Sequence, residues 1–202
     1  MLKKIKNEFV SKEFLANLVL LAIIRRQVIN INMKKFFSLC CVYIVLHSFN
    51  LVHAEEPKFI EVYKDWYVFT LKQKETKVCY LSSLATKSKG NYTKRGDVLF
   101  MVTHRAAKSA PGEINFRAGY KFKKNTKATI TINQKKFTLF TQGSDGWAKD
   151  SKTDNQITQA MIRGSQMIVV GVSSRGTETT DTFSLSGFTA AHKAARKACK
   201  IK

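Results

Sequence analysis

Few side chains in residues 55–202 could carry out acid–base or nucleophilic chemistry. The only histidines in this range are His104 and His192. His104 lies beside Arg105 and His192 lies among alanines and lysines, settings more typical of structural or solvated histidines than of catalytic ones. Residues 171–176, Gly-Val-Ser-Ser-Arg-Gly, resemble a serine-nucleophile turn but lack the second glycine at the required spacing. The sequence therefore predicts a protein that is not an enzyme.

Metal and cofactor binding are not expected either. Metal sites need His, Cys, Asp or Glu at characteristic spacings, and the sequence has no such group. Asp150 and Asp154 could form a carboxylate pair, but they lie in a segment rich in Ser, Lys and Thr, where solvated side chains are the expectation. We therefore predict no catalytic residues, no metal ligands and no cofactor.

The basic stretch from Tyr120 to Lys127 is the most suggestive binding feature. The candidate anion-binding residues are Lys121, Lys123, Lys124 and Lys127. If they converge on one sheet edge or hairpin, they would attract phosphate or sulfate groups, with Tyr120 and Phe122 available for contact. The alternative is that these lysines keep an exposed edge from pairing with other strands. The sequence favours this alternative, because the other lysines are scattered over the whole domain.

Two short patterns have both a functional and a structural interpretation. Arg95-Gly96-Asp97 is the tripeptide that integrins recognise, but Asp97 adjoins an expected strand, which favours a role in a turn. Trp66 and Trp147 could stack on a ligand, but aromatic side chains in β-sandwiches normally fill the space between sheets. We therefore expect a turn at the tripeptide and a core position for both tryptophans.

The net charge indicates which partners the protein could attract. The 202-residue chain carries a formal charge of +21; eight basic and two acidic residues lie in residues 1–54, so residues 55–202 retain +15. Such a domain is attracted to polyanions, whether nucleic acid, anionic lipid or acidic polysaccharide. The hydrophobic content of 44% is that of a globular chain.

A secretory leader is predicted at residues 33–54. Met33-Lys34-Lys35 supplies the positive start, residues 36–52 are apolar, and cleavage is expected between Ala54 and Glu55. The alternative is an uncleaved membrane anchor, because the apolar run is nearly long enough to span a bilayer. Residues 1–32 are interpreted as an upstream extension or a mis-assigned start. The expected location is the periplasm or cell envelope.

Cleavage of the leader would leave two cysteines, Cys79 and Cys199. Two thiols in an oxidising compartment predict one disulfide. The alternative is a pair of free, buried thiols, because an unpaired cysteine often behaves as a small core residue.

Residues 55–202 show short β-type segments separated by turn residues, as expected of an antiparallel sandwich or barrel. The predicted strands are Trp66–Leu71, Lys77–Leu84, Val98–His104, Ile114–Tyr120, Ala128–Asn133, Lys136–Thr141, Gln166–Ser173 and Thr180–Leu185. Two short helices are also predicted, Asn155–Arg163 capped by Asp154 and Ala190–Cys199 capped by Thr189. On the second helix, Cys199 lies on the same stripe as Ala191 and Ala195, which faces the core.

An ordered set of short motifs resembles the invasion-associated locus B family of Gram-negative bacteria. The motifs are Asp65-Trp66-Tyr67-Val68, Cys79, Lys94-Arg95-Gly96-Asp97, Gly119-Tyr120, Trp147-Ala148, Ala160-Met161, Gly164, Gly171, Ser173, Arg175-Gly176, Asp181 and Leu185-Ser186-Gly187-Phe188. The resemblance covers roughly residues 61–199. It implies a mainly β fold, an immunoglobulin-like antiparallel β-sandwich, together with export and a role linked to host-cell invasion.

The leading hypothesis is an exported, non-enzymatic binding protein of the periplasm or envelope. Its partner is unknown; an envelope component, a host-cell surface or an anionic polysaccharide or lipid would fit the charge. The alternative is a polyanion- or nucleic-acid-binding basic protein. Nucleic acid is the weaker choice, because the export signal and the lack of an aromatic-rich RNA-binding motif argue against it.

Overall fold

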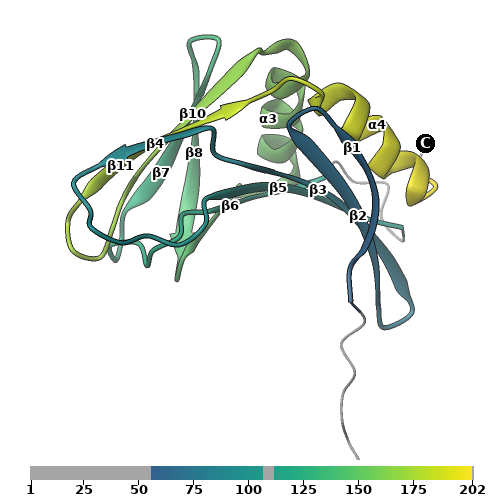
Figure 1. The fold of residues 1–202 in the computed structure, drawn as a ribbon, viewed down its shortest axis with the longest axis horizontal. Helices are drawn as coiled ribbons and strands as arrows, with labels where there is room; N and C mark the ends of the chain where they lie inside the picture. Colours follow the sequence, from purple (N-terminus) through teal and green to yellow (C-terminus); the bar gives the residue numbers. More distant parts are fainter. Residues whose placement is uncertain (1–55, 107–111, 202) are drawn as a thin grey trace, which may run out of the picture. The chain divides into compact units, whose positions relative to one another are not determined.

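The computed structural model describes residues 56–106 and 112–201 (Figure 1). The strands are β1 (Lys58–Tyr63), β2 (Trp66–Gln73), β3 (Thr76–Leu84), β4 (Lys87–Gly90), β5 (Leu99–Arg105), β6 (Glu113–Arg117), β7 (Lys127–Ile132), β8 (Lys135–Gln142), β9 (Asp145–Trp147), β10 (Gln166–Val172) and β11 (Glu178–Ser184), and the helices are α3 (Ser151–Arg163) and α4 (Phe188–Ala198). The predicted leader and the cleavage site between Ala54 and Glu55 lie outside the described residues. Neither of these two helices is long and apolar enough to cross a membrane.

The strands form one antiparallel sheet in the order β1-β2-β3-β5-β6-β9-β8-β7-β10-β11-β4. The chain passes directly from β3, near one end of this order, to β4 at the other. Ala85 donates its N–H to the Val98 carbonyl at 3.0 Å, and Thr86 donates to the Thr182 carbonyl of β11 at 2.8 Å. Consecutive residues therefore join opposite halves of the sheet, which bends back on itself (Figure 1).

The two halves of the sheet face each other across one core. Phe183 of β11 packs edge-on against Phe100 of β5 at 5.7 Å and Phe116 of β6 at 6.2 Å between ring centroids. Trp66 of β2 is fully buried and donates its indole N–H to the Ser184 carbonyl at 3.0 Å. The expected mainly β, antiparallel architecture is confirmed, and both layers of the sandwich belong to one continuous sheet.

All eight predicted strands are present, but three further strands were missed. β1 has side chains exposed on both faces, so it lacks the alternation that marks a half-buried strand. β4 and β9 are short and each contains a glycine, Gly90 and Gly146, a residue type more typical of turns than of strands. β6 ends at Arg117, three residues before the predicted end, because the chain turns at Gly119, whose φ is 70°.

Both helices form, but both predicted caps were wrong. Asp150 caps α3, its carboxylate accepting the Thr153 N–H at 2.7 Å. Asp154 instead points into the protein and accepts the Ile114 N–H at 2.9 Å, which ties α3 to β6. α4 begins after Gly187 with no side-chain cap. Gly187 adopts a φ of 88°, and any Cβ there would overlap the Tyr63 carbonyl, so close approach of β1 rather than a capping hydroxyl fixes this helix start.

Helix α4 is joined covalently to the sheet. Cys79 of β3 and Cys199 at the end of α4 form the predicted disulfide, with Cα atoms 5.8 Å apart and 120 residues between them in sequence. Both cysteines are buried in the core. The bond therefore fixes the C-terminal end of α4 on β3.

A disulfide that closes a loop of this length should contribute strongly to stability, by about 2–5 kcal/mol. We predict that replacing both cysteines (Cys79→Ala and Cys199→Ala) lowers the free energy of unfolding in urea by this amount. Reducing the unchanged protein with dithiothreitol should lower it similarly. Equal stability of the oxidised and reduced proteins would contradict the prediction.

Two histidines lie near the disulfide: His104 of β5 is paired in register with Cys79, and His192 belongs to α4. The rings of His104 and His192 have centroids 5.1 Å apart, and neither ring nitrogen of His104 has a hydrogen-bond partner among the described residues. The pKa of each histidine is lowered to about 4, mainly by burial and in smaller part by the positive charge of Arg196; for His104 the neighbouring His192 contributes as well. The pair is therefore neutral at neutral pH, which agrees with the structural role expected from the sequence.

The lowered pKa values predict instability in acid. The unfolded chain takes up protons near pH 6.5 while the folded state takes them up only near pH 4. The contribution of the two histidines to the free energy of unfolding should therefore be fully present above pH 6.5. Between pH 6.5 and pH 4 it should fall by about 1.4 kcal/mol per pH unit and per histidine. Urea unfolding at pH 4 to 7 of the protein and of a His104→Phe/His192→Leu variant measures it. Parallel pH profiles of the two proteins would refute the assignment.

Candidate functional site

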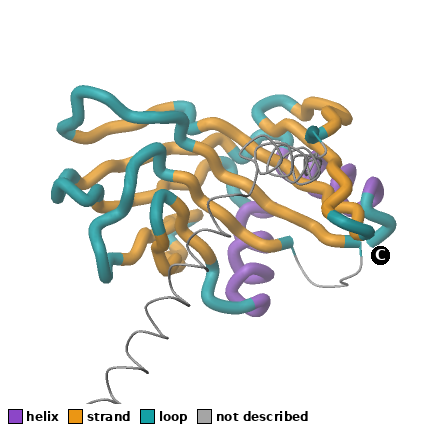
Figure 2. Tube along the Cα trace, turned by 90° about the horizontal axis from the view of Figure 1, so that it is seen from below, coloured by secondary structure: helices purple, strands orange, loops and turns teal. Residues whose placement is uncertain are grey.

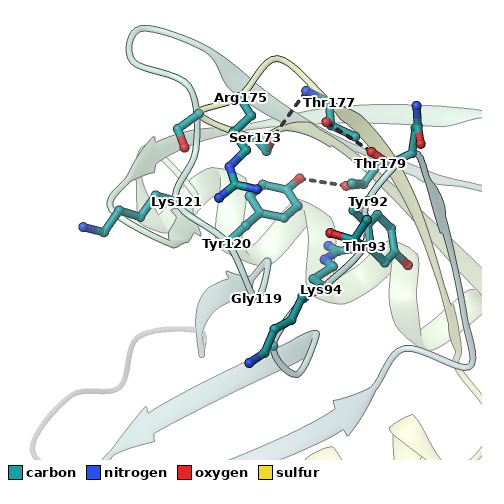
Figure 3. Close-up of a pocket in the computed structure, with 14 residues that line it drawn as sticks. Tyr92, Thr93, Lys94, Gly119, Tyr120, Lys121, Ser173, Arg175, Thr177 and Thr179 are labelled. Carbon is teal, nitrogen blue, oxygen red and sulfur yellow. Dashed lines mark hydrogen bonds between the residues drawn. The ribbon is translucent and has the colours of Figure 1, made fainter.

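A cavity of about 670 Å³ lies among loops that Figure 1 shows at the end of the sheet away from α4. Three chain segments line it: residues 91–96 between β4 and β5, residues 119–121 after β6, and residues 173–179 at the turn between β10 and β11 (Figure 3). Figure 2 shows loops gathered at this end of the sheet. Its volume is within the range of about 300–1,000 Å³ typical of small-molecule sites.

A buried ion pair joins two of the elements at the pocket. Arg95 donates from both terminal nitrogens to the carboxylate of Asp181 on β11, each at 2.7 Å, and from Nε to the Ala118 carbonyl at 2.7 Å. The side chains are 4% and 0% exposed. Burial alone would lower the pKa of Arg95, but the Asp181 carboxylate raises it. The arginine charge is thus neutralised within the protein wall.

Tyr120 packs on this ion pair and forms part of the pocket wall. The guanidinium carbon of Arg95 lies 4.7 Å from the centre of the Tyr120 ring and 5.4 Å from that of Tyr92. The Tyr120 hydroxyl shares a hydrogen bond of 2.7 Å with Thr179 (Figure 3), whose hydroxyl is 3.5 Å from the Asp181 carboxylate. Burial raises the pKa of Tyr120, so its phenol stays neutral. These contacts fix the ring in position.

Close backbone contact sets the spacing of the first two segments. Gly96 donates its N–H to the Gly119 carbonyl at 3.0 Å, and a Cβ on Gly119 would overlap the Gly96 carbonyl. The structure assigns no turn to Arg95-Gly96-Asp97, which lies in an irregular segment before β5 where Gly96 contacts Gly119. With its arginine side chain buried on Asp181, the tripeptide does not present the charge that an integrin would contact.

Three exposed cations line the pocket: Lys94, Lys121 and Arg175. Its lining contains no histidine, cysteine or carboxylate. Across residues 56–106 and 112–201, none of the five ion pairs involves any of these three cations. The pocket therefore presents positive charge to solvent.

Of the four lysines proposed as an anion site, only Lys121 lines this pocket. Lys123 and Lys124 lie in the following turn and Lys127 begins β7; all four are exposed. Phe122, between Lys121 and Lys123, is buried and pairs with Ser173. Alternation along an extended chain therefore turns both of these lysines to the side opposite the Phe122 ring. Their convergence on one anion site, like the alternative that they protect a strand edge, stays a prediction.

Other candidate residues lie away from the pocket. Trp66 is in the core as expected, but Trp147 is 37% exposed, so its expected core position was wrong: β9 is a short strand whose buried residue is Gly146. Asp150 and Asp154 act separately, as a helix cap and as the partner of a strand amide. The described residues contain no cluster of three or more potential metal ligands.

The family assignment rests on the pattern of the whole domain. The sequence pattern of the family described as Invasion associated locus B (IalB) protein matches residues 66–196. The chain belongs to the invasion-associated locus B family. Comparison with curated proteins finds no match.

In this member of the locus B family, the pocket is assembled from motifs that the sequence analysis noted separately. Arg95, Gly119, Tyr120, Ser173 and Asp181 all belong to the motif set that carried the resemblance, and the fold brings them to one end of the sheet. The sequence analysis did not predict that these residues lie close together, because Arg95 and Asp181 are 86 residues apart in the chain. The one available signal was the opposite charge of two motif residues near expected strands.

The ion pair yields a test of how the pocket wall is held. Arg95→Met leaves the Asp181 carboxylate buried without its partner, so we predict a loss of about 3–5 kcal/mol in the free energy of unfolding. The double variant Arg95→Met/Asp181→Leu removes both charges and should recover most of that loss. Urea denaturation measures all three proteins, and equal destabilisation by the single and double variants would show that the pairing is not the cause.

Proposed function

We propose that this locus B family protein is an exported, non-enzymatic binding protein of the periplasm or cell envelope, and that the pocket holds its ligand. The carrying observation is a preformed cavity whose wall is fixed by a buried ion pair and whose lining lacks a histidine, cysteine or carboxylate. General acid–base catalysis most often uses such groups at the reacting centre. A rigid wall suits recognition, because little ordering is needed when the ligand arrives.

Export is supported by the leader and by the disulfide. The leader-like residues 33–54 precede the domain, and Cys79 is paired with Cys199. Structural disulfides persist in oxidising compartments and are rare in the cytosol. The family description links its members with invasion, so we place the ligand on the bacterial envelope or the host-cell surface.

The proposal is tested on protein recovered from a periplasmic fraction. Its first residue should be Glu55, and mass spectrometry after thiol labelling should find no free cysteine. This mature protein should bind saturably to isolated envelope or host-cell membranes. Tyr92→Ala removes an exposed ring from the pocket lining without changing charge, and should weaken that binding at least about tenfold, as expected for a recognition contact.

Phe140→Ala is the matched control, because Phe140 is also an exposed ring but lies on β8, outside the pocket lining. It should leave binding unchanged. Recovery of the protein only from the cytoplasm with two free thiols would overturn the export proposal. Equal binding by both variants and the unchanged protein would overturn the role of the pocket.

A further inference from the structure

The charge of the pocket points to the kind of ligand it accepts. Arg95 is neutralised by Asp181, whereas Lys94, Lys121 and Arg175 belong to no ion pair within the described part of the chain. No carboxylate lines the cavity. Three cations around one concave surface favour an anionic ligand, because their fields add where solvent is partly excluded.

The rest of the lining combines an aromatic ring with several hydroxyl groups. It offers the exposed ring of Tyr92 and the hydroxyls of Thr93, Ser174 and Thr177. An aromatic ring provides an apolar face beside a polar edge, and hydroxyls both donate and accept hydrogen bonds. These groups match a ring-shaped, hydroxyl-rich molecule.

We propose that the pocket binds an acidic saccharide, a sugar unit carrying carboxylate or sulfate groups. This inference rests on the proposed function, in which the pocket is the ligand site. Arg175 can form a two-point contact with a carboxylate or sulfate, and Lys94 and Lys121 contribute point charges from the other two segments. Tyr92 contacts the sugar ring. Arg95 takes no direct part; it holds the wall against which the sugar lies.

The neighbouring lysines supply a control that the chain itself offers. Lys123, Lys124 and Lys127 are exposed, adjoin the pocket segment in sequence and lie outside the lining. The triple variant Lys94→Gln/Lys121→Gln/Arg175→Gln removes the same charge as Lys123→Gln/Lys124→Gln/Lys127→Gln. All six side chains are exposed, so both triple variants should keep the thermal unfolding midpoint of the unchanged protein.

The probe is a heparin-derived tetrasaccharide, measured by titration calorimetry on the mature protein. The variant with all three pocket cations replaced should bind the tetrasaccharide at least about 30-fold more weakly, because its charge-assisted contacts are lost. The slope of log affinity against log salt concentration should also fall by about two, because fewer counterions are released on binding. The neighbouring triple should change affinity less than about threefold, through the general field alone. Equal losses in both triples would overturn the proposal in favour of attraction by total charge.

Three further ligands define the chemistry. A hyaluronan tetrasaccharide, which carries carboxylates alone, should bind if carboxylate suffices, and its failure beside heparin binding assigns the site to sulfated sugars. Neutral cellotetraose should not bind. Inorganic sulfate that displaces heparin at equal anion concentration would overturn recognition of the sugar ring.

The outcome separates this inference from the proposed function. If no acidic saccharide binds while Tyr92→Ala still abolishes attachment to membranes, the ligand class is wrong and the pocket remains the site. If no acidic saccharide binds and Tyr92→Ala leaves attachment to membranes unchanged, both proposals fail.

Discussion

The buried contact between Arg95 and Asp181 is the interaction on which the pocket depends. Taking two charges out of water is unfavourable, and the pair persists because its geometry is two-pronged and a backbone carbonyl satisfies the remaining guanidinium nitrogen. The pair connects the β4–β5 loop with β11, and Tyr120 rests on it. Three segments distant in sequence form one wall, and backbone hydrogen bonds from Gly96 to Gly119 and from Ser174 to Lys121 also join them.

This arrangement divides the basic residues of the domain into two kinds. Arg95 is buried inside the structure, where Asp181 neutralises its charge. Most of the remaining positive charge lies on the surface and determines the overall attraction to anions. Long-range attraction alone gives little selectivity, because exposed charges are screened within about 10 Å. Selectivity has to come from shape and from groups held rigidly, and the pocket at the end of the sheet is where the fold supplies both.

Much of the fold could be predicted, because it follows either from local sequence patterns or from the number of cysteines in the domain. Alternating apolar residues mark a strand wherever one face is buried, which is why β2, β3 and β7 were recognised and β1, which has no buried residue, was not. The disulfide followed because the domain has two cysteines and no other pairing exists. The caps failed where two aspartates compete: Asp150 and Asp154 look alike in sequence, and burial against β6 decides between them. The pocket was not predictable, because it depends on residues 86 positions apart.

The two long-range links act near opposite edges of the strand order, the disulfide on β3 and the ion pair on β11. At one end the disulfide and the histidine pair fix α4 on the sheet; at the other the ion pair fixes the loops of the pocket. Pairings between strands far apart in sequence, such as β4 with β11, cost loop-closure entropy, and each link restricts the loops that such pairings leave. Because protonation of the histidines acts on α4, acid should loosen that end first, while the ion pair, which involves neither histidine, keeps the pocket wall in place.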